Sequence, residues 1–80
     1  MRGKWEKAFA VVNDEGRTIT YINPASSYTI ESRLRHIPHA NRSGTWDHTS
    51  YFVLKDGEEI TEKSTLKGAK QFINDKENKQ

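Results

Sequence analysis

Residues 51–63 read YFVLKDGEEITEK and residues 64–76 read STLKGAKQFINDK, and these two stretches decide the fold. Asp56 and Gly57 separate two runs with strand preferences. An Asp-Gly pair favours a type I′ turn, in which both central residues need positive φ. The sequence therefore predicts a β-hairpin over residues 51–63.

A helix is predicted directly after this hairpin, over residues 65–76, with Ser64 as its N-cap. Its apolar residues recur at helical spacing and form one face: Leu66, Ala69, Phe72 and Ile73. Four of the six residues in 58–63 are charged, which is typical of an edge strand protected from pairing. The sequence leaves open whether this edge pairs with a second chain. Residues 77–80 are expected to be a frayed polar tail of a single domain, residues 1–76.

A second hairpin is predicted near the start of the chain, with strands over residues 7–13 and 17–22. A three-residue loop with Gly16 at positive φ joins them. This loop pairs Asn13 with Arg17 and places the large apolar side chains of both strands on one face. The predicted core therefore contains Phe9, Val11, Ile19, Tyr21, Val53, Ile60, Leu66, Ala69, Phe72 and Ile73.

Residues 24–37 fit two interpretations. Ile30, Leu34 and Ile37 have helical spacing, and Pro38 would end a helix there. The residues around Ile30 also have strand preferences, so a strand is the alternative. We favour a short helix. The predicted fold is α+β: an antiparallel sheet of two β-hairpins, with three or four strands, packed on the C-terminal helix in the order ββα–loop–ββα.

Composition excludes several classes of protein. The chain has 80 residues, a net charge of +2 and no cysteine, so disulfides and thiolate zinc sites are excluded. No apolar run is long enough to span a membrane, and no secretory signal is recognisable. We therefore expect a cytoplasmic protein with no membrane partner.

The segment from Arg33 to His48 has the only local basic bias, with three arginines and three histidines. Residues 36–48 are expected to lack regular structure. The forked donors of the arginine guanidinium suit phosphate groups, and the tryptophan ring offers a flat face on which a nucleobase can stack. The candidate binding residues are Arg33, Arg35, His39, Arg42, Trp46 and His48, with Lys4 and Trp5 in a smaller basic and aromatic cluster. The alternative is a solvated loop in which Trp46 folds back into the core, while Trp5 caps the first hairpin.

Catalysis and metal binding are not predicted. Ser43, Asp47 and His48 have the residue types of a nucleophilic triad, but neighbours in sequence rarely converge in triad geometry. The histidines match no metal-ligand spacing, and a domain of this size has little room for a pocket. We expect no cofactor and no small-molecule substrate.

The sequence therefore predicts a small non-enzymatic binding protein. The favoured interpretation is a protein–protein interaction module or inhibitor, of phage or mobile-element type, that occupies a surface of a host protein. The alternative is a nucleic-acid-binding domain that uses residues 33–48 and the N-terminal arm. A net charge of +2 is modest for such a domain, because its affinity rests largely on phosphate neutralisation. The identity of the partner, the organism and the oligomeric state do not follow from the sequence.

Overall fold

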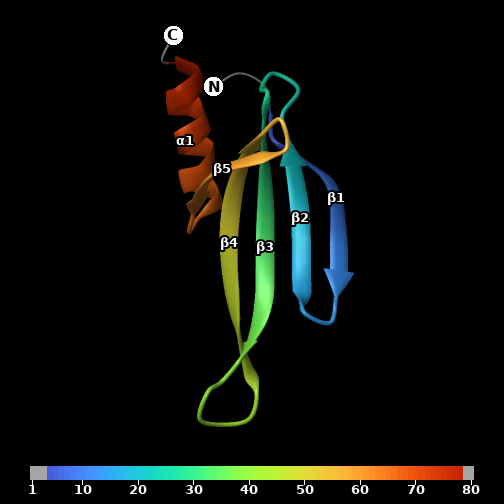
Figure 1. The fold of residues 1–80 in the computed structure, drawn as a ribbon. Helices are drawn as coiled ribbons and strands as arrows, with labels where there is room; N and C mark the ends of the chain where they lie inside the picture. Colours follow the sequence, from blue (N-terminus) through green and yellow to red (C-terminus); the bar gives the residue numbers. More distant parts are fainter. Residues whose placement is uncertain (1–3, 79–80) are drawn as a thin grey trace.

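The computed structural model describes residues 4–78, which form one five-stranded sheet and one helix. The strands are all antiparallel neighbours in chain order (Figure 1). The α+β prediction is confirmed, although the sheet has five strands rather than three or four. The elements are β1 (Glu6–Asn13), β2 (Gly16–Ile22), β3 (Tyr28–Pro38), β4 (Thr45–Lys55), β5 (Glu58–Lys63) and α1 (Leu66–Asn78).

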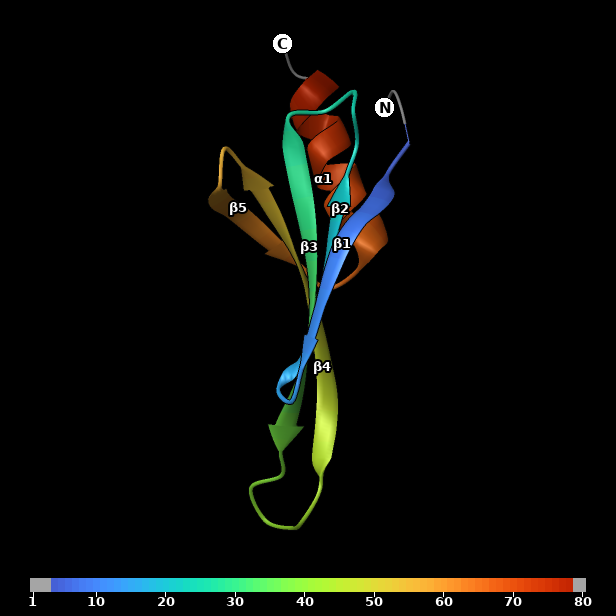
Figure 2. The same ribbon diagram turned by 90° about the vertical axis from the view of Figure 1, so that its right-hand side faces the viewer.

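The helix packs on one face of the sheet and contacts only β3, β4 and β5. We call this side of the sheet the helix face and the opposite side the open face. Ile30, Val53, Ala69 and Ile73 are fully buried between sheet and helix. Figure 2 shows α1 beside only the upper half of the sheet, while the β3–β4 hairpin continues below it. Among residues 4–78, no helix or strand packs on the open face.

The prediction of a short helix within residues 24–37 is wrong, because Tyr28–Pro38 forms the central strand β3. This strand pairs with β2 on one side and with β4 on the other. Because side chains alternate along a strand, Ile30 and Leu34 lie on the helix face while Ile37 lies on the open face. The helical spacing of these three residues was therefore coincidental. Pairing with β2 and β4, together with burial of Ile30 beneath α1, decided the structure.

The Asp56-Gly57 turn is confirmed, with φ of 55° at Asp56 and 81° at Gly57. The register of this hairpin differs from the prediction. A shift between Val53 and Leu54 places Val53 opposite Thr61 instead of Ile60. Ile60 is therefore 42% exposed, and its assignment to the core was wrong.

The first hairpin also has a different register, because Asn13 pairs with Gly16 instead of Arg17. A slip of one residue moves a whole set of side chains to the other face of a sheet. Phe9 and Val11 lie on the open face and are exposed, so their assignment to the core was wrong. The remaining predicted core residues are buried or pack against the core at its rim: Ile19, Tyr21, Val53, Leu66, Ala69, Phe72 and Ile73.

Helix α1 begins one residue later than expected. The Thr65 hydroxyl accepts a hydrogen bond from the Gly68 N–H at 2.9 Å, so Thr65 rather than Ser64 is the N-cap. The helix continues to Asn78, and the last two residues of the expected tail lie outside the described residues.

Candidate binding surface

Four of the candidate residues lie on one face of two neighbouring strands. Residues 36–48 were expected to be irregular, but most of them belong to β3 and β4. The register places Arg35 opposite His48, and Ile37 opposite Trp46. Arg33 lies two residues before Arg35 on the same side. The open face of β3 and β4 therefore collects Arg33, Arg35, Trp46 and His48.

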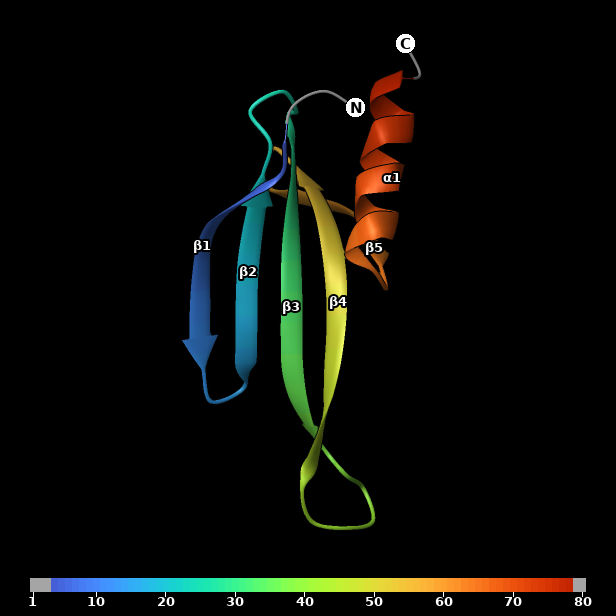
Figure 3. The ribbon, with the colours of Figure 1, turned by 180° about the vertical axis from the view of Figure 1, so that it is seen from behind.

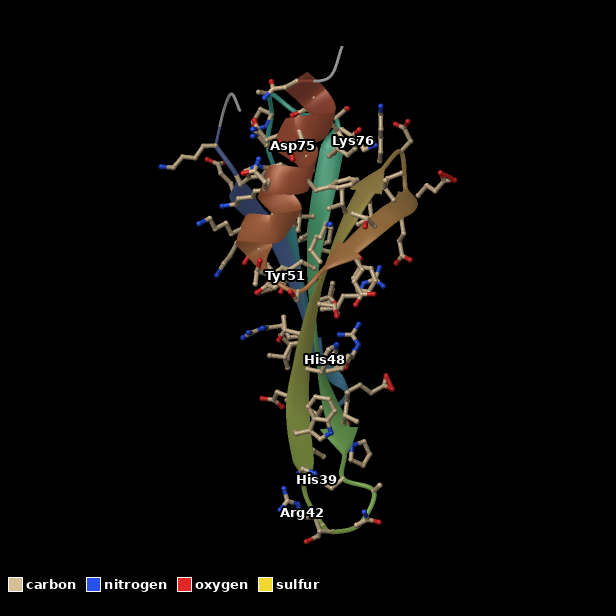
Figure 4. The ribbon with its side chains drawn as sticks, turned by 90° about the vertical axis from the view of Figure 1, so that its left-hand side faces the viewer. His39, Arg42, His48, Tyr51, Asp75 and Lys76 are labelled. Carbon is tan, nitrogen blue, oxygen red and sulfur yellow. The ribbon has the colours of Figure 1, made fainter. Side chains whose placement is uncertain are left out.

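The lower part of the β3–β4 hairpin extends beyond the rest of the sheet. Strand β2 pairs with β3 only as far as Arg35, and the His36 N–H donates to the Glu15 carbonyl at 2.9 Å. Beyond His36, β3 and β4 pair only with each other. We call residues 36–48 the hairpin extension. Its loop is closed by a hydrogen bond from the His39 N–H to the Gly44 carbonyl at 3.2 Å. Figure 4 shows His39 and Arg42 at this loop, far from Asp75 and Lys76 on α1.

Trp46 is the largest apolar side chain of the hairpin extension, and 45% of it is exposed. Its indole meets the His48 ring edge-on, with 5.7 Å between ring centroids. The His48 Nε2 lies 3.1 Å from the Ser50 hydroxyl, which holds the imidazole in place. The predicted alternative, in which Trp46 folds back into the core, is therefore wrong.

A second contact braces the other face of the hairpin extension. The His36 Nδ1 lies 2.7 Å from an Asp47 carboxylate oxygen, and both side chains are exposed. Asp47 and His48 point to opposite faces because they are adjacent in a strand. The three triad residue types do not converge.

Arg33 is neutralised by two carboxylates. Its Nη2 lies 2.6 Å from Glu31 and 2.7 Å from Glu59, and its guanidinium lies 4.0 Å above the centre of the Phe52 ring. Burial lowers the pKa of Arg33, but the hydrogen bonds to Glu31 and Glu59 outweigh it and leave that pKa above its ordinary value. The guanidinium thus covers Phe52 and is not free to bind phosphate.

Arg35 is held against the sheet by uncharged partners. Its guanidinium donates to the carbonyls of Arg17 and Leu34 at 3.3 Å and 2.9 Å and to the Thr18 hydroxyl at 3.2 Å. Arg42 lies in the exposed loop, and within the described part of the chain its side chain makes no hydrogen bond or ion pair. Of the three arginines expected to bind phosphate, only Arg42 presents an unengaged guanidinium.

The N-terminal cluster lies at the other end of the molecule. Trp5 is half-buried and packs against the core between the sheet and α1, whose fully buried residues include none of the first hairpin. Lys4 is exposed beside it. Strand β1 starts at this end and runs down to the turn at Asn13, so the structure does not bring Lys4 and Trp5 to the hairpin extension.

One exposed apolar surface, on β1 and β2, was not predicted from the sequence. Phe9, Val11 and Ile22 are exposed on the open face, and Val12 is exposed on the helix face. Their alternation with small and polar residues suggested a buried strand, but no element covers them. Register alone does not explain them, since Val12 faces the helix side and is still exposed. Helix α1 contacts only β3, β4 and β5, and no signal in the sequence indicates that it leaves β1 uncovered.

The described part of the chain offers no cluster of metal ligands and no membrane-spanning segment. Within residues 4–78, histidine and carboxylate side chains nowhere gather in a group of three that could hold an ion. The one helix of this part is too short and too polar to cross a bilayer.

Comparison with known proteins does not assign the chain to a family. No family model matches it, and no similar curated protein or solved structure was found. Any function must therefore be argued from the surface itself.

Proposed function

We propose that this protein is a small non-enzymatic binding protein that occupies the surface of another protein through its hairpin extension. The main support for this proposal is that Trp46 is exposed at the end of a projecting hairpin. The edge-on His48 ring holds the indole in place. A large aromatic side chain whose ring already contacts a neighbouring ring loses little conformational freedom on binding. Such residues dominate the energetics of protein interfaces.

The charges of the open face also support a protein partner. Arg33 is offset by Glu31 and Glu59, and Arg35 is bonded to backbone carbonyls. A face that is nearly neutral and partly apolar suits a protein surface better than a phosphate backbone. The expected partner is a host protein, and the expected effect of binding is inhibition by occupancy.

The test is affinity capture from host lysate with three forms of the chain: the natural sequence, Trp46→Ala and Ile60→Ala. Ile60 is a matched control, since its exposed fraction of 42% is close to the 45% of Trp46, but it lies on β5. We expect one stoichiometric partner with the natural sequence and with Ile60→Ala. Trp46→Ala should weaken its affinity about tenfold or more, as for a hot-spot residue. Equal capture by all three forms, or no partner, would contradict the proposal.

A nucleic-acid partner is the second candidate, favoured because the unengaged Arg42 and the exposed Trp46 both belong to the hairpin extension. Polarisation titrations with single-stranded and duplex DNA and RNA at several salt concentrations test it. If this candidate is right, Arg42→Ala lowers the slope of log affinity against log salt by about one. Absence of binding at low salt would eliminate it.

A further inference from the structure

Strand β1 is the most exposed element of the sheet. All eight of its residues are exposed, including Phe9 at 63% and Val12 at 73%. It pairs with β2 on one side only, and on its outer side it has no strand partner among residues 4–78. Figure 3 shows β1 at the outer edge of the sheet, on the side away from α1.

The two edges of the sheet differ in their chemistry. Strand β5 carries four charged residues out of six, which discourages pairing with another chain. Strand β1 has an uninterrupted apolar run from Ala8 to Val12, without charge or proline. Its one protective feature is the register shift between Lys7 and Phe9, which leaves residues 9–13 as a regular ladder. An edge of this kind is suited to receiving another strand.

The surface area and radius of gyration of the chain are larger than those of a compact domain of the same length. Its accessible surface is 5762 Å², whereas a compact chain of this size exposes about 4,900 Å². Its radius of gyration is 14.4 Å, compared with about 12 Å for a compact domain of this length. The projecting hairpin extension accounts for part of this excess, and β1, with all eight residues exposed, contributes to the rest.

We propose that a second copy of this chain occupies the edge of β1, so that two β1 strands pair antiparallel across a two-fold axis. The two copies then share one continuous ten-stranded sheet. Such an interface uses the same patch on both chains, and a two-fold arrangement is the commonest form of oligomer. Helix α1 lies over β3, β4 and β5 and does not obstruct this edge.

The side chains of β1 favour a copy of itself. In an antiparallel alignment centred on Val11, Phe9 of each copy lies near Val11 of the other on the open face. Val12 of each copy meets Ala10 of the other on the helix face. The regular part of the strand, residues 9–13, thus brings apolar side chains together on both faces and is self-complementary.

This dimer does not depend on the proposed protein partner. The β1 edge and the hairpin extension involve different strands, so each can be altered without the other. A dimer would carry two hairpin extensions, one from each copy.

Sedimentation equilibrium of the full chain tests the dimer. At about 100 µM we expect twice the mass of one chain. Val11→Asp places an unpaired charge at the centre of the interface, and we expect it to weaken the dimer about hundredfold or more. Ile60→Asp on β5 is the control and should leave the dimer intact. Circular dichroism establishes that each variant is folded.

A substitution on the other face of the same strand provides a second test. Val12→Asp sets a charge against Ala10 of the second copy and should also weaken the dimer about tenfold or more. A natural chain that stays monomeric would overturn the proposal and leave β1 for a strand of another protein. A dimer disrupted by Ile60→Asp rather than Val11→Asp, or open-ended assembly, would also overturn it.

Discussion

The two ends of the β3–β4 hairpin contain the same kind of backbone ladder but lie in different surroundings. At the upper end α1 covers the sheet, and Ile30 and Val53 are fully buried. At the lower end the hairpin extension has no covering element, and Trp46 is exposed. An isolated two-stranded hairpin is only marginally stable in water. Burial against the helix, rather than the backbone hydrogen bonds, therefore sets where the fold is stable and where surface is left for binding.

The largest expected effect tests this difference directly. Ile73→Ala removes a fully buried side chain between helix and sheet, and we expect it to lower the free energy of unfolding by about 2–5 kcal/mol. The control Trp46→Ala removes an exposed side chain of the hairpin extension and should change that free energy by less than about 1 kcal/mol. Urea unfolding monitored by circular dichroism measures both. Similar losses from the two variants would mean that Trp46 is packed as closely as the residues beneath α1.

Gly16 lies in a part of the sheet that α1 does not cover, yet its backbone packs closely against β3. Its φ is 152°, and an added Cβ would lie 1.9 Å from the Leu34 carbonyl oxygen. Gly16→Ala must therefore push β2 away from β3, at a cost of about 3 kcal/mol. At Gly57 nothing lies within 4 Å of an added Cβ, so Gly57→Ala should cost only about 1 kcal/mol, from its positive φ. Equal unfolding midpoints for the two variants would show that β2 and β3 separate easily.

Arg33 lies between the two ends and connects β3 to β5 through Glu59. Arg33→Ala uncovers Phe52 and leaves two carboxylates without their shared cation, so we expect a loss of about 1–2 kcal/mol. Arg42→Ala, in the exposed loop, should change stability by less than about 0.5 kcal/mol. The loss at Arg33 should shrink at high salt, because part of it is electrostatic. An identical loss at low and high salt would attribute it to the uncovered ring alone.

The smallest effect concerns the start of the helix. Thr65→Ala removes the hydroxyl that accepts the Gly68 N–H and should cost about 1 kcal/mol. Ser64→Ala, at the N-cap expected from the sequence, should leave stability nearly unchanged. Thermal unfolding of both variants distinguishes them, and a larger loss at Ser64 would contradict the observed cap.

The candidate site was only partly predictable. Arg33, Arg35, Trp46 and His48 were selected for their chemistry, and the structure does place them on one face. The pairing that neutralises Arg33 was not foreseeable, because Glu59 comes from a strand 26 residues away in the sequence. The N-terminal cluster was grouped with the others by composition, but the direction of β1 places it at the opposite end of the molecule.

The sequence by itself determined the features whose causes are local. The Asp56-Gly57 turn follows from the positive φ that both residues adopt, and the apolar face of α1 follows from spacing along a helix. The tertiary structure alone decided that residues 28–38 form a strand and that Phe9 faces outward. Both outcomes depend on pairing with strands distant in the sequence. A one-residue difference in register, which no local preference selects, decides whether Phe9 and Val11 lie on the helix face or on the open face.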